Sequence, residues 1–430
     1  MIHNFAEKKT SDTKISLNTQ VIIMGAGPAG AGTSIFLTRA GIPHVIIEKN
    51  QFPRDKICGD ACSGKTVFVL RKANPLWPDE IFKNTADYMP SHGVIFVSPN
   101  GKLLNIPFNP AKIPEGQAPG FITPRLIFDN FLFEKLASEY AAIYQKATVK
   151  SMERQADGKV KVSFSQGDET YEVTAPLIVG ADGDKSQVRK NFLSSHSSSK
   201  AYCVGLRAYY HGVTGLHENH FIELHFLPEV LPGYFWIFPL PNGITNVGIG
   251  MMSDRIRKKK INLREEMLNA IKTNPNISHR FSNAKLLDKI QGWGLPMCMK
   301  RQPLSGDNFL LTGDAAGMID PFTGEGIGNA LYSGMLAAFA IDELLKADEY
   351  DAALIKEKYD DVLFKRIGNE LKTSATLQRL CHYRWLFNFV VEKAHKSKTL
   401  NNTITSMFTG IDLRKQLRKP SFYARILLNR

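Results

Sequence analysis

The 430-residue sequence is poor in cysteine, with only Cys58, Cys62, Cys203, Cys298 and Cys381. Their odd number and wide spacing argue against the disulfide framework of a secreted protein and indicate a reducing compartment. No second C-x-x-C or Cys/His pair accompanies Cys58 and Cys62, so we expect no metal site.

Long hydrophobic runs are also missing. No stretch approaches the roughly 18 to 20 apolar residues that cross a bilayer. Residues 1–19 are polar and lack the apolar core of a signal peptide, so we expect a flexible leader there. The overall hydrophobic content of 43% still supports a substantial core. These features predict a cytoplasmic protein.

The positive charge is unevenly placed. Residues 351–430 hold 16 basic and 7 acidic side chains, which is a net charge of +9 out of +13 for the chain. One interpretation is a solvated basic face. The other is attraction to an anionic membrane surface, such as the inner face of the cell membrane, because apolar residues are interleaved with the bases. Those apolar residues are Trp385, Leu386, Phe387, Phe389, Val390, Val391, Phe422, Tyr423, Ile426, Leu427 and Leu428. Nucleic acid is not expected as a partner, since no recognised binding fold is visible.

A glycine-rich turn follows the first apolar segment, in the order Val21-Ile-Ile-Met-Gly25-Ala-Gly27-Pro28-Ala29-Gly30. The pattern predicts a strand, a tight turn and a helix N-terminus. Gly25 allows the turn, Gly27 lets backbone approach a phosphate, and Gly30 permits close helix packing. The helix dipole and free N–H groups then face a dinucleotide pyrophosphate.

A second predicted strand over residues 44–47 ends at Glu48. A carboxylate there accepts hydrogen bonds from ribose hydroxyls and repels a 2′-phosphate, which favours FAD or NAD over NADP. A βαβ unit without a ligand is the alternative.

The later segments alternate between strand and helix patterns. We expect a loop over residues 51–64, a hairpin over 91–108, a helix from Arg125 to about Ala142, strands over 147–179, and a sheet over 201–250. Residues 254–271 are expected to be helical and basic. A strand and turn return at residues 309–317, a long apolar helix follows Pro321 to Gly328, and residues 351–430 are expected to be helical throughout.

Three of these motifs together carry a resemblance. The Gly25–Gly30 turn with Glu48, the Gly180-Ala-Asp182-Gly183 segment and the Gly313-Asp314 block resemble the group 2 FAD-dependent, aromatic hydroxylase-like flavoproteins. Within them, Phe52-Pro-Arg-x-Lys-x-Cys58-Gly59-Asp60, Tyr234-x-Trp236-x-Phe238-Pro and the residues around Trp385 are most similar to the geranylgeranyl reductase family.

The resemblance implies an α/β fold, with a Rossmann-like FAD-binding domain, an inserted antiparallel β substrate domain and a helical C-terminal region. The implied boundaries are 20–90, 110–190 and 290–348 for the FAD-binding domain, 91–109 and 191–289 for the substrate domain, and 349–430 for the helical region. The implied FAD-binding residues are Gly25, Gly27, Pro28, Ala29, Gly30, Glu48, Lys49, Cys58, Gly59, Arg125, Asp182, Gly183, Gly313, Asp314, Pro321, Gly324, Gly326 and Ile327.

Several of these roles have a physical basis. Arg125 would pair with phosphate or hold the ribityl side, and Asp314 would hydrogen-bond ribityl hydroxyls. Asp182 with Gly183 would lie beneath the cofactor, although an Asp-Gly turn has the same signature. The glycines of the segment Pro321 to Gly328 would leave N–H groups open before a helix end that favours the negative charge of reduced flavin.

The resemblance also places Cys58 near the flavin ring, as a proton donor or substrate gate; an inert buried cysteine is the alternative. Asp60 is a second catalytic candidate, and it departs from the family motif, which often has glycine there. Tyr234, Trp236 and Phe238 alternate along a strand, either as an apolar substrate wall or as packing under the sheet.

The function that these features predict is FAD-dependent reduction of C=C double bonds in a prenyl or similar lipid-like substrate, with NAD(P)H or another reductant as electron donor. One alternative is an FAD-dependent monooxygenase or halogenase on the same fold. Halogenases usually show W-x-W-x-I-P, where this chain has Tyr234 and Phe238 at the first and fifth positions. Another alternative is an FAD-containing protein that binds lipid surfaces. The oligomeric state is left open.

Overall fold

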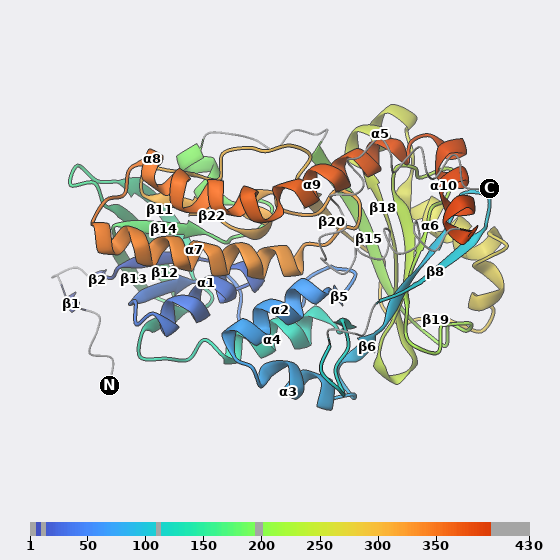
Figure 1. Cartoon of the computed structure of the whole chain (residues 1–430). Helices are drawn as coiled ribbons and strands as arrows, with labels where there is room; N and C mark the ends of the chain where they lie inside the picture. The colour runs from blue at the N-terminus through green and yellow to red at the C-terminus, as the bar shows by residue number, and fades with distance from the viewer. Residues whose placement is uncertain (1–5, 10–13, 109–112, 194–200, 397–430) are drawn as a thin grey trace.

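The computed structural model describes residues 6–9, 14–108, 113–193 and 201–396. Two large sheets dominate it and lie toward opposite ends of the molecule, with the mostly parallel sheet on the left and the larger antiparallel sheet on the right (Figure 1). The mixed α/β class and the helical C-terminal region predicted from the sequence are confirmed.

The parallel sheet has six strands in the order β10-β4-β3-β14-β22-β21, of which β21 alone pairs antiparallel. Its strands are β3 (Val21–Met24), β4 (His44–Ile47), β10 (Ala141–Tyr144), β14 (Leu177–Gly180), β21 (Ser305–Gly306) and β22 (Phe309–Leu311). Every residue of β3, β4 and β14 is buried, as expected for a parallel sheet whose two faces are both covered.

Helices α1 (Pro28–Arg39) and α7 (Ile327–Ala347) pack closely against each other beside this sheet. A Cβ on Gly32 would lie 2.8 Å from the Leu331 carbonyl oxygen, and one on Gly334 would lie 2.3 Å from that of Ala29. Glycine at these two positions therefore lets the two backbones touch. This contact brings the N-termini of both helices to one edge of the sheet.

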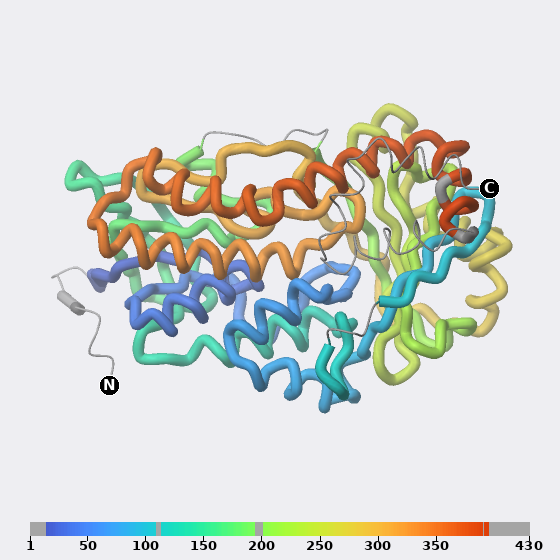
Figure 2. Tube along the Cα trace, in the orientation of Figure 1, coloured from blue at the N-terminus to red at the C-terminus, as the bar shows by residue number. Residues whose placement is uncertain are grey.

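The antiparallel sheet has the order β19-β15-β18-β17-β16-β7-β8, with β20 paired to β15. Its strands are β7 (Gly93–Val97), β8 (Leu103–Pro107), β15 (Tyr202–His211), β16 (Ile222–His225), β17 (Tyr234–Pro239), β18 (Ile244–Met252), β19 (Lys285–Leu286) and β20 (Gln291–Pro296). The predicted hairpin is confirmed as β7 and β8. It joins β16 in parallel, and Figure 2 shows its cyan chain running to the yellow-green strands.

The remaining strands form two smaller sheets. One has the order β1-β2-β13-β12-β11, and the other β5-β9-β6. Their strands are β1 (Ala6–Lys9), β2 (Lys14–Asn18), β11 (Thr148–Arg154), β12 (Val160–Gln166), β13 (Glu169–Ala175), β5 (Ala61–Cys62), β9 (Gly120–Ile122) and β6 (Met89–Ser91). Residues 14–18, expected within a flexible leader, instead form β2, because they pair with β13 and bury Leu17.

The remaining helices are α2 (Gly64–Ala73), α3 (Trp77–Lys83), α4 (Arg125–Glu134), α5 (Ser253–Lys259), α6 (Leu263–Thr273), α8 (Ala352–Ile355), α9 (Val362–Leu380) and α10 (Arg384–Lys396). The helix expected to reach Ala142 ends at Glu134, since the chain enters β10 at Ala141. The predicted helical character holds from Ala352 to Lys396, and the apolar tail residues Phe422 to Leu428 lie outside the described residues.

Among the helices that the structure describes, none combines the length and the apolar character that crossing a membrane requires.

Candidate functional site

The glycine turn between β3 and α1 has no room for side chains. Gly25 has φ +96°, and a Cβ there would lie 2.7 Å from the Ala181 carbonyl oxygen. A Cβ on Gly30 would lie 1.8 Å from the Gly25 carbonyl oxygen. Gly27 is the N-cap of α1, and no side chain caps this helix end. Backbone N–H groups are therefore available to an anion at the start of α1.

Glu48 at the end of β4 holds this turn in place. Its side chain is buried; Oε2 accepts a hydrogen bond from the Ala26 N–H and Oε1 one from the Asn50 N–H, both at 2.8 Å. Each carboxylate oxygen has a second lone pair, so ribose hydroxyls can still donate to Glu48. Lys49, the next residue, has an exposed side chain.

Arg125 at the start of α4 forms a buried ion pair within the protein. Its Nε and Nη2 donate to the two carboxylate oxygens of Asp129 at 2.6 and 2.7 Å, and Arg54 Nη1 lies 2.9 Å from the same carboxylate. Burial alone would raise the pKa of Asp129, but the Arg125 guanidinium outweighs it and keeps that pKa below its usual value. Asp129 therefore holds the Arg125 guanidinium beside the cavity described below.

Two further predicted carboxylates lie near the same edge of the sheet. Asp182 Oδ2 accepts the Gln187 N–H at 2.6 Å, so this side chain closes its own turn, and Gly183 has φ +80°. Burial raises the pKa of Asp182. Asp314, which follows Gly313 in a short 3-10 helix, lies 2.8 Å from Lys56 Nζ. Lys56 belongs to the Cys58 loop, so this ion pair connects that loop to the parallel sheet.

The segment Pro321 to Gly328 leads into α7 as expected, but its N–H groups are not all open. Glu325 Oε1 accepts the Gly328 N–H at 2.6 Å and thereby caps the helix. Burial raises the pKa of the Glu325 carboxyl group. Tyr234 Oη donates to the Thr323 carbonyl at 2.7 Å and fixes the segment to β17.

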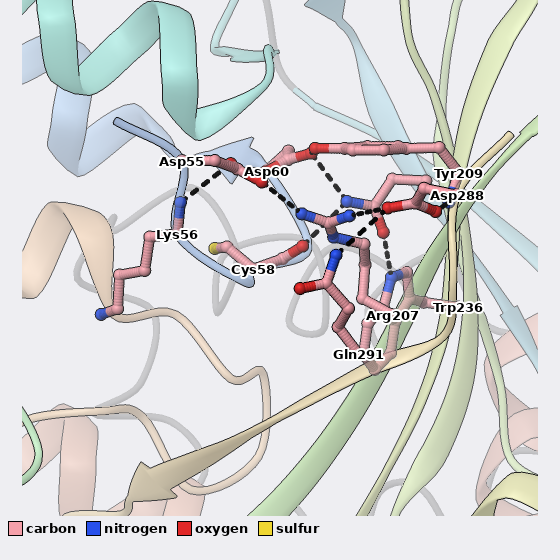
Figure 3. A network of polar contacts seen from close by, with 10 residues as sticks. Asp55, Lys56, Cys58, Asp60, Arg207, Tyr209, Trp236, Asp288 and Gln291 are labelled. Carbon is pink, nitrogen blue, oxygen red and sulfur yellow. Dashed lines mark hydrogen bonds and ion pairs between the residues drawn. The ribbon is translucent and has the colours of Figure 1, made fainter. Parts of the chain in front are cut away.

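Cys58 is the only one of the five cysteines that is partly exposed, and all five lie within the described residues. Its turn is fastened to the antiparallel sheet by Asn246, whose Nδ2 donates to the Cys58 carbonyl at 2.8 Å and to Asp60 Oδ2 at 2.7 Å. Trp236 Nε1 donates to Asn246 Oδ1 at 2.9 Å (Figure 3). Burial raises the pKa of the Cys58 thiol, so it keeps its proton at neutral pH.

The predicted aromatic strand lies directly against this turn. A Cβ on Gly59 would lie 3.1 Å from the Phe238 ring and 3.7 Å from Trp236 Nε1. The glycine therefore lets the turn approach the rings closely. Tyr234, Trp236 and Phe238 all line the cavity next to Cys58 as well as packing in the core beneath it.

One cavity of about 510 Å³ joins these parts. Gly27, Pro28, Ala29 and Asp314 of the parallel-sheet part line it, and so does the Cys58 turn. Apolar side chains also line it, namely Phe121, Ile122, Ile222, Leu224, Phe226, Trp236 and Phe238. A cavity that combines backbone and polar groups with apolar walls suits a cofactor together with an apolar substrate.

Sequence reasoning missed several polar residues at this site, namely Asp129, Arg207, Tyr209, Asn246 and Glu325. Arg207 and Asn246 are polar residues within otherwise apolar predicted strands. That break in the pattern is a signal that could have marked them as buried partners.

The comparisons agree with this geometry. A family model described as an FAD binding domain matches residues 18–354. The digeranylgeranylglycerophospholipid reductase 2 of Methanosphaera stadtmanae is 28% identical over 358 residues, covering 83% of this chain and 86% of that protein. The menaquinone reductase of Mycolicibacterium smegmatis is 28% identical over 341 residues, covering 75% and 76%.

Among solved structures, a geranylgeranyl bacteriochlorophyll reductase-like protein from Thermoplasma acidophilum has the same fold, with a TM-score of 0.76 at 21% identity. The match covers 94% of this chain and 99% of that one. The predicted FAD cofactor and oxidoreductase activity are therefore confirmed: the chain belongs to the FAD binding domain family and is an FAD-dependent oxidoreductase.

Proposed function

We propose that this protein reduces C=C double bonds in the prenyl chains of a lipid. The observation that carries the proposal is the single cavity that runs from the glycine turn, past Cys58, to an apolar part lined by aromatic rings. An FAD-dependent hydride transfer and a long apolar substrate can meet in such a space. The names of the curated relatives, which include reductases of digeranylgeranylglycerophospholipid, support this substrate class.

The FAD-binding residues follow from the same geometry. The N–H groups at Gly27 and the start of α1 would hold the pyrophosphate, Glu48 the ribose and Asp314 the ribityl chain. Arg54, which already pairs with Asp129, stands 3.3 Å from the position of a Cβ at Gly27, so a cation also borders the phosphate position. Bound FAD, once reduced by NAD(P)H or another donor, would supply the hydride.

Cys58 would supply the proton. Saturation of an alkene adds a hydride to one carbon and a proton to the other, and an isolated alkene accepts hydride poorly unless protonation accompanies it. The Cys58 thiol is protonated at neutral pH because burial raises its pKa. The Arg125 guanidinium lowers that pKa in part, so it would stabilise the thiolate left after proton transfer.

The test is an anaerobic incubation of photoreduced enzyme with geranylgeranylated glycerophospholipid or with menaquinone, followed by mass spectrometry. Each reduced bond should add two hydrogen atoms to the prenyl chain. Cys58→Ser should slow the reaction about 10²-fold or more, as loss of a general acid does. Cys298→Ser, a buried cysteine that does not line the cavity, is the matched control and should retain the activity.

Absence of flavin reoxidation with every prenyl substrate would contradict the proposal. Oxygen consumption coupled to substrate-triggered NAD(P)H oxidation would instead identify a monooxygenase.

We further propose an anionic membrane surface as the partner that presents the lipid. Tyr383 and Trp385, between α9 and the first turn of α10, are 55% and 70% exposed, and the adjacent Cys381 lines the cavity. Helix α5 has no buried residue and has basic side chains in its last turn. Burial, and then the charges of Arg255 and Lys259, lower the pKa of His382, so α5 lies electrostatically close to this turn. Exposed aromatics beside basic residues are typical of the membrane interface.

Cosedimentation with vesicles tests this surface. Binding should be stronger to phosphatidylglycerol-containing vesicles than to pure phosphatidylcholine. Trp385→Ala should weaken it several-fold, and Lys258→Glu with Lys259→Glu should weaken it about thirtyfold or more. Each base near an anionic surface contributes about 1 kcal/mol. Leu76→Ala, which removes a similarly exposed apolar side chain (69%) beside α3, is the control. Equal losses in the control and test variants would overturn the assignment.

A further inference from the structure

Three carboxyl groups gather around one guanidinium beneath the Cys58 turn (Figure 3). The Arg207 side chain is 1% exposed and donates to Asp288 at 2.6 Å and to Asp55 at 2.9 Å. Its guanidinium lies 4.0 Å from the ring centre of Tyr209, whose Oη donates to Asp60 Oδ2 at 2.6 Å. The carboxyl group of Asp60 is thus the third of the cluster.

One positive charge does not balance three negative charges in a buried place, so one carboxyl group is favoured to hold a proton. The side chains of Asp55 and Asp288 are 44% and 27% exposed, and water stabilises their charges. Asp60 is fully buried, and its Oδ1 has no hydrogen-bond partner among the described residues. Asp60 is therefore the carboxyl group of the three that is most favoured to take up a proton as the pH falls: burial raises its pKa to about 7, although the hydrogen bonds from Tyr209 and Asn246 favour the carboxylate.

Asp60 is tied to Cys58 through a short, rigid turn. Asp60 has φ +67°, a left-handed conformation that favours glycine and that aspartate tolerates better than most residues. Asn246 Nδ2 bridges the Cys58 carbonyl and the Asp60 carboxyl group. The turn thus fixes the Asp60 carboxyl group relative to the Cys58 backbone, close enough for its charge to act on the thiol.

Several other charges act on these two groups. Arg207, on β15, favours ionisation of Asp60, and Asp55, on the same loop as Cys58, opposes it. Burial and a negative charge on Asp60 oppose the Cys58 thiolate, whereas Arg125 on α4, the backbone N–H of Asp60 and Lys56 on the loop favour it. The thiol of Cys62 is buried and stays protonated, because burial raises its pKa well above the usual value.

We propose that Asp60 is a positioning residue that keeps the Cys58 thiol protonated, acting through its carboxyl charge and not by contact with substrate. The use of that proton in alkene reduction rests on the proposed function. As the pH rises, Asp60 loses its proton before Cys58 does, and the carboxylate then makes removal of the thiol proton harder. The two acids thereby avoid carrying a negative charge together.

The test measures alkylation of Cys58 by iodoacetamide from pH 6 to 10 on the FAD-containing protein, with the modified peptide quantified by mass spectrometry. Iodoacetamide reacts with the thiolate, so the rate follows the ionised fraction. Asp60→Asn keeps the shape and an acceptor for Tyr209 and Asn246 but carries no charge. We expect its apparent thiol pKa to fall, which speeds alkylation at pH 8 about threefold or more, because one pKa unit corresponds to about tenfold.

Two further variants separate charge from structure. Asp60→Gly keeps the left-handed turn and also lacks the charge, so it should show the same acceleration as Asp60→Asn. Acceleration in Asp60→Gly alone would mean that a loosened turn, not charge, controls the thiol, and would overturn the proposal. Asp55→Asn removes one carboxylate from the same cluster and should change the rate less than Asp60→Asn does.

Unchanged alkylation in Asp60→Asn would also overturn the proposal. Cys58→Ser should abolish the modified peptide and so confirms the assignment of the signal. The alkylation assay contains no lipid and requires no turnover. Its result can therefore be interpreted even if the protein proves not to be a prenyl reductase, and a failure of this proposal can be told apart from a failure of the proposed function.

Discussion

At the scale of single residues, the glycine turn has almost no space for added side-chain atoms at the end of the cavity where the cofactor is proposed to bind. Gly30 is a helical residue whose Cβ would overlap the Gly25 carbonyl oxygen, and a Cβ on Gly25 would lie 2.7 Å from the Ala181 carbonyl oxygen. Glu48 then fixes the Ala26 N–H between them. A change at one of these positions must displace backbone, because no flexible side chain is available to move.

Replacement of Gly30 by alanine tests this point. The Cβ would lie 1.8 Å from the Gly25 carbonyl oxygen, so the turn must open. We expect FAD affinity to fall about tenfold or more, which corresponds to about 1.4 kcal/mol, as measured by fluorescence titration. The control is Gly158→Ala, where φ is +78° and no atom lies within 4 Å of the new Cβ. It should cost about 1 kcal/mol of stability through backbone strain and leave FAD affinity unchanged; an equal loss of affinity in both variants would contradict this account.

At the scale of elements, the loop between β4 and β5 is held to the antiparallel sheet by side chains of β15 and β18. Arg207 reaches Asp55, Tyr209 reaches Asp60, and Asn246 reaches the Cys58 carbonyl. These contacts set where the thiol lies relative to the aromatic strand. The loop is thus positioned by a sheet that is distant in sequence, and its own residues do not determine its place.

Replacement of Arg207 by methionine should loosen this attachment. It leaves three carboxyl groups without their cation, and we expect a loss of about 3 kcal/mol in the free energy of unfolding, measured with urea. The loss should shrink as the pH is lowered, since protonation relieves the repulsion. Arg154→Met removes an exposed arginine that donates to the Asp307 carbonyl, and it should cost less than about 1 kcal/mol. A pH-independent loss in Arg207→Met would argue against charge repulsion.

At the scale of the whole molecule, the cavity exists because two sheets meet. Gly27 and Asp314 belong to the parallel-sheet part, whereas Trp236 and Phe238 belong to the antiparallel sheet. Helices α9 and α10 run from one part to the other in Figure 1, and Phe387 of α10 packs 4.5 Å from Phe226 at the apolar end. Helix α9 packs in the core of the parallel-sheet part and α10 in the separate core at the apolar end, so these two helices connect the two ends.

The stability of the whole fold should depend on pH through His44 at the start of β4. Its ring is fully buried between Ser34 Oγ at 2.7 Å and the Ile42 carbonyl at 2.9 Å, and burial lowers its pKa from 6.5 to about 4. The unfolded chain binds this proton first as the pH falls, so stability declines between about pH 6.5 and pH 4 by up to about 3 kcal/mol.

Urea unfolding at pH 5 and pH 7 measures this decline. His44→Gln removes the titrating ring and should give a smaller difference between the two pH values than the unmodified protein. His279→Gln, at an exposed position, is the control and should leave the difference as it was. Identical differences in all three proteins would exclude His44 as the source.

The sequence by itself determined the features that depend on neighbouring residues. The spacing of Gly25, Gly27 and Gly30 specifies a turn because the positive φ of Gly25 and the close approach of Gly30 to Gly25 both lie within six residues. Apolar periodicity likewise predicted strands and helices, since the period of a strand or helix is a local property. The turn and Glu48 left FAD or NAD open, and the family resemblance that the motifs carry in their order implied the α/β fold and FAD.

Only the tertiary structure decided which side chains face Cys58. Asn246 and Asp60 are 186 residues apart, and Arg207 and Asp55 are 152 apart, so no local pattern connects them. Asp129 accepts hydrogen bonds from two nitrogen atoms of Arg125. Glu325 accepts the Gly328 N–H at the start of α7, where the N–H groups were expected to be open. Charge, burial and pKa at the site depend on distances between such groups, and those distances exist only when the two sheets have closed around the cavity.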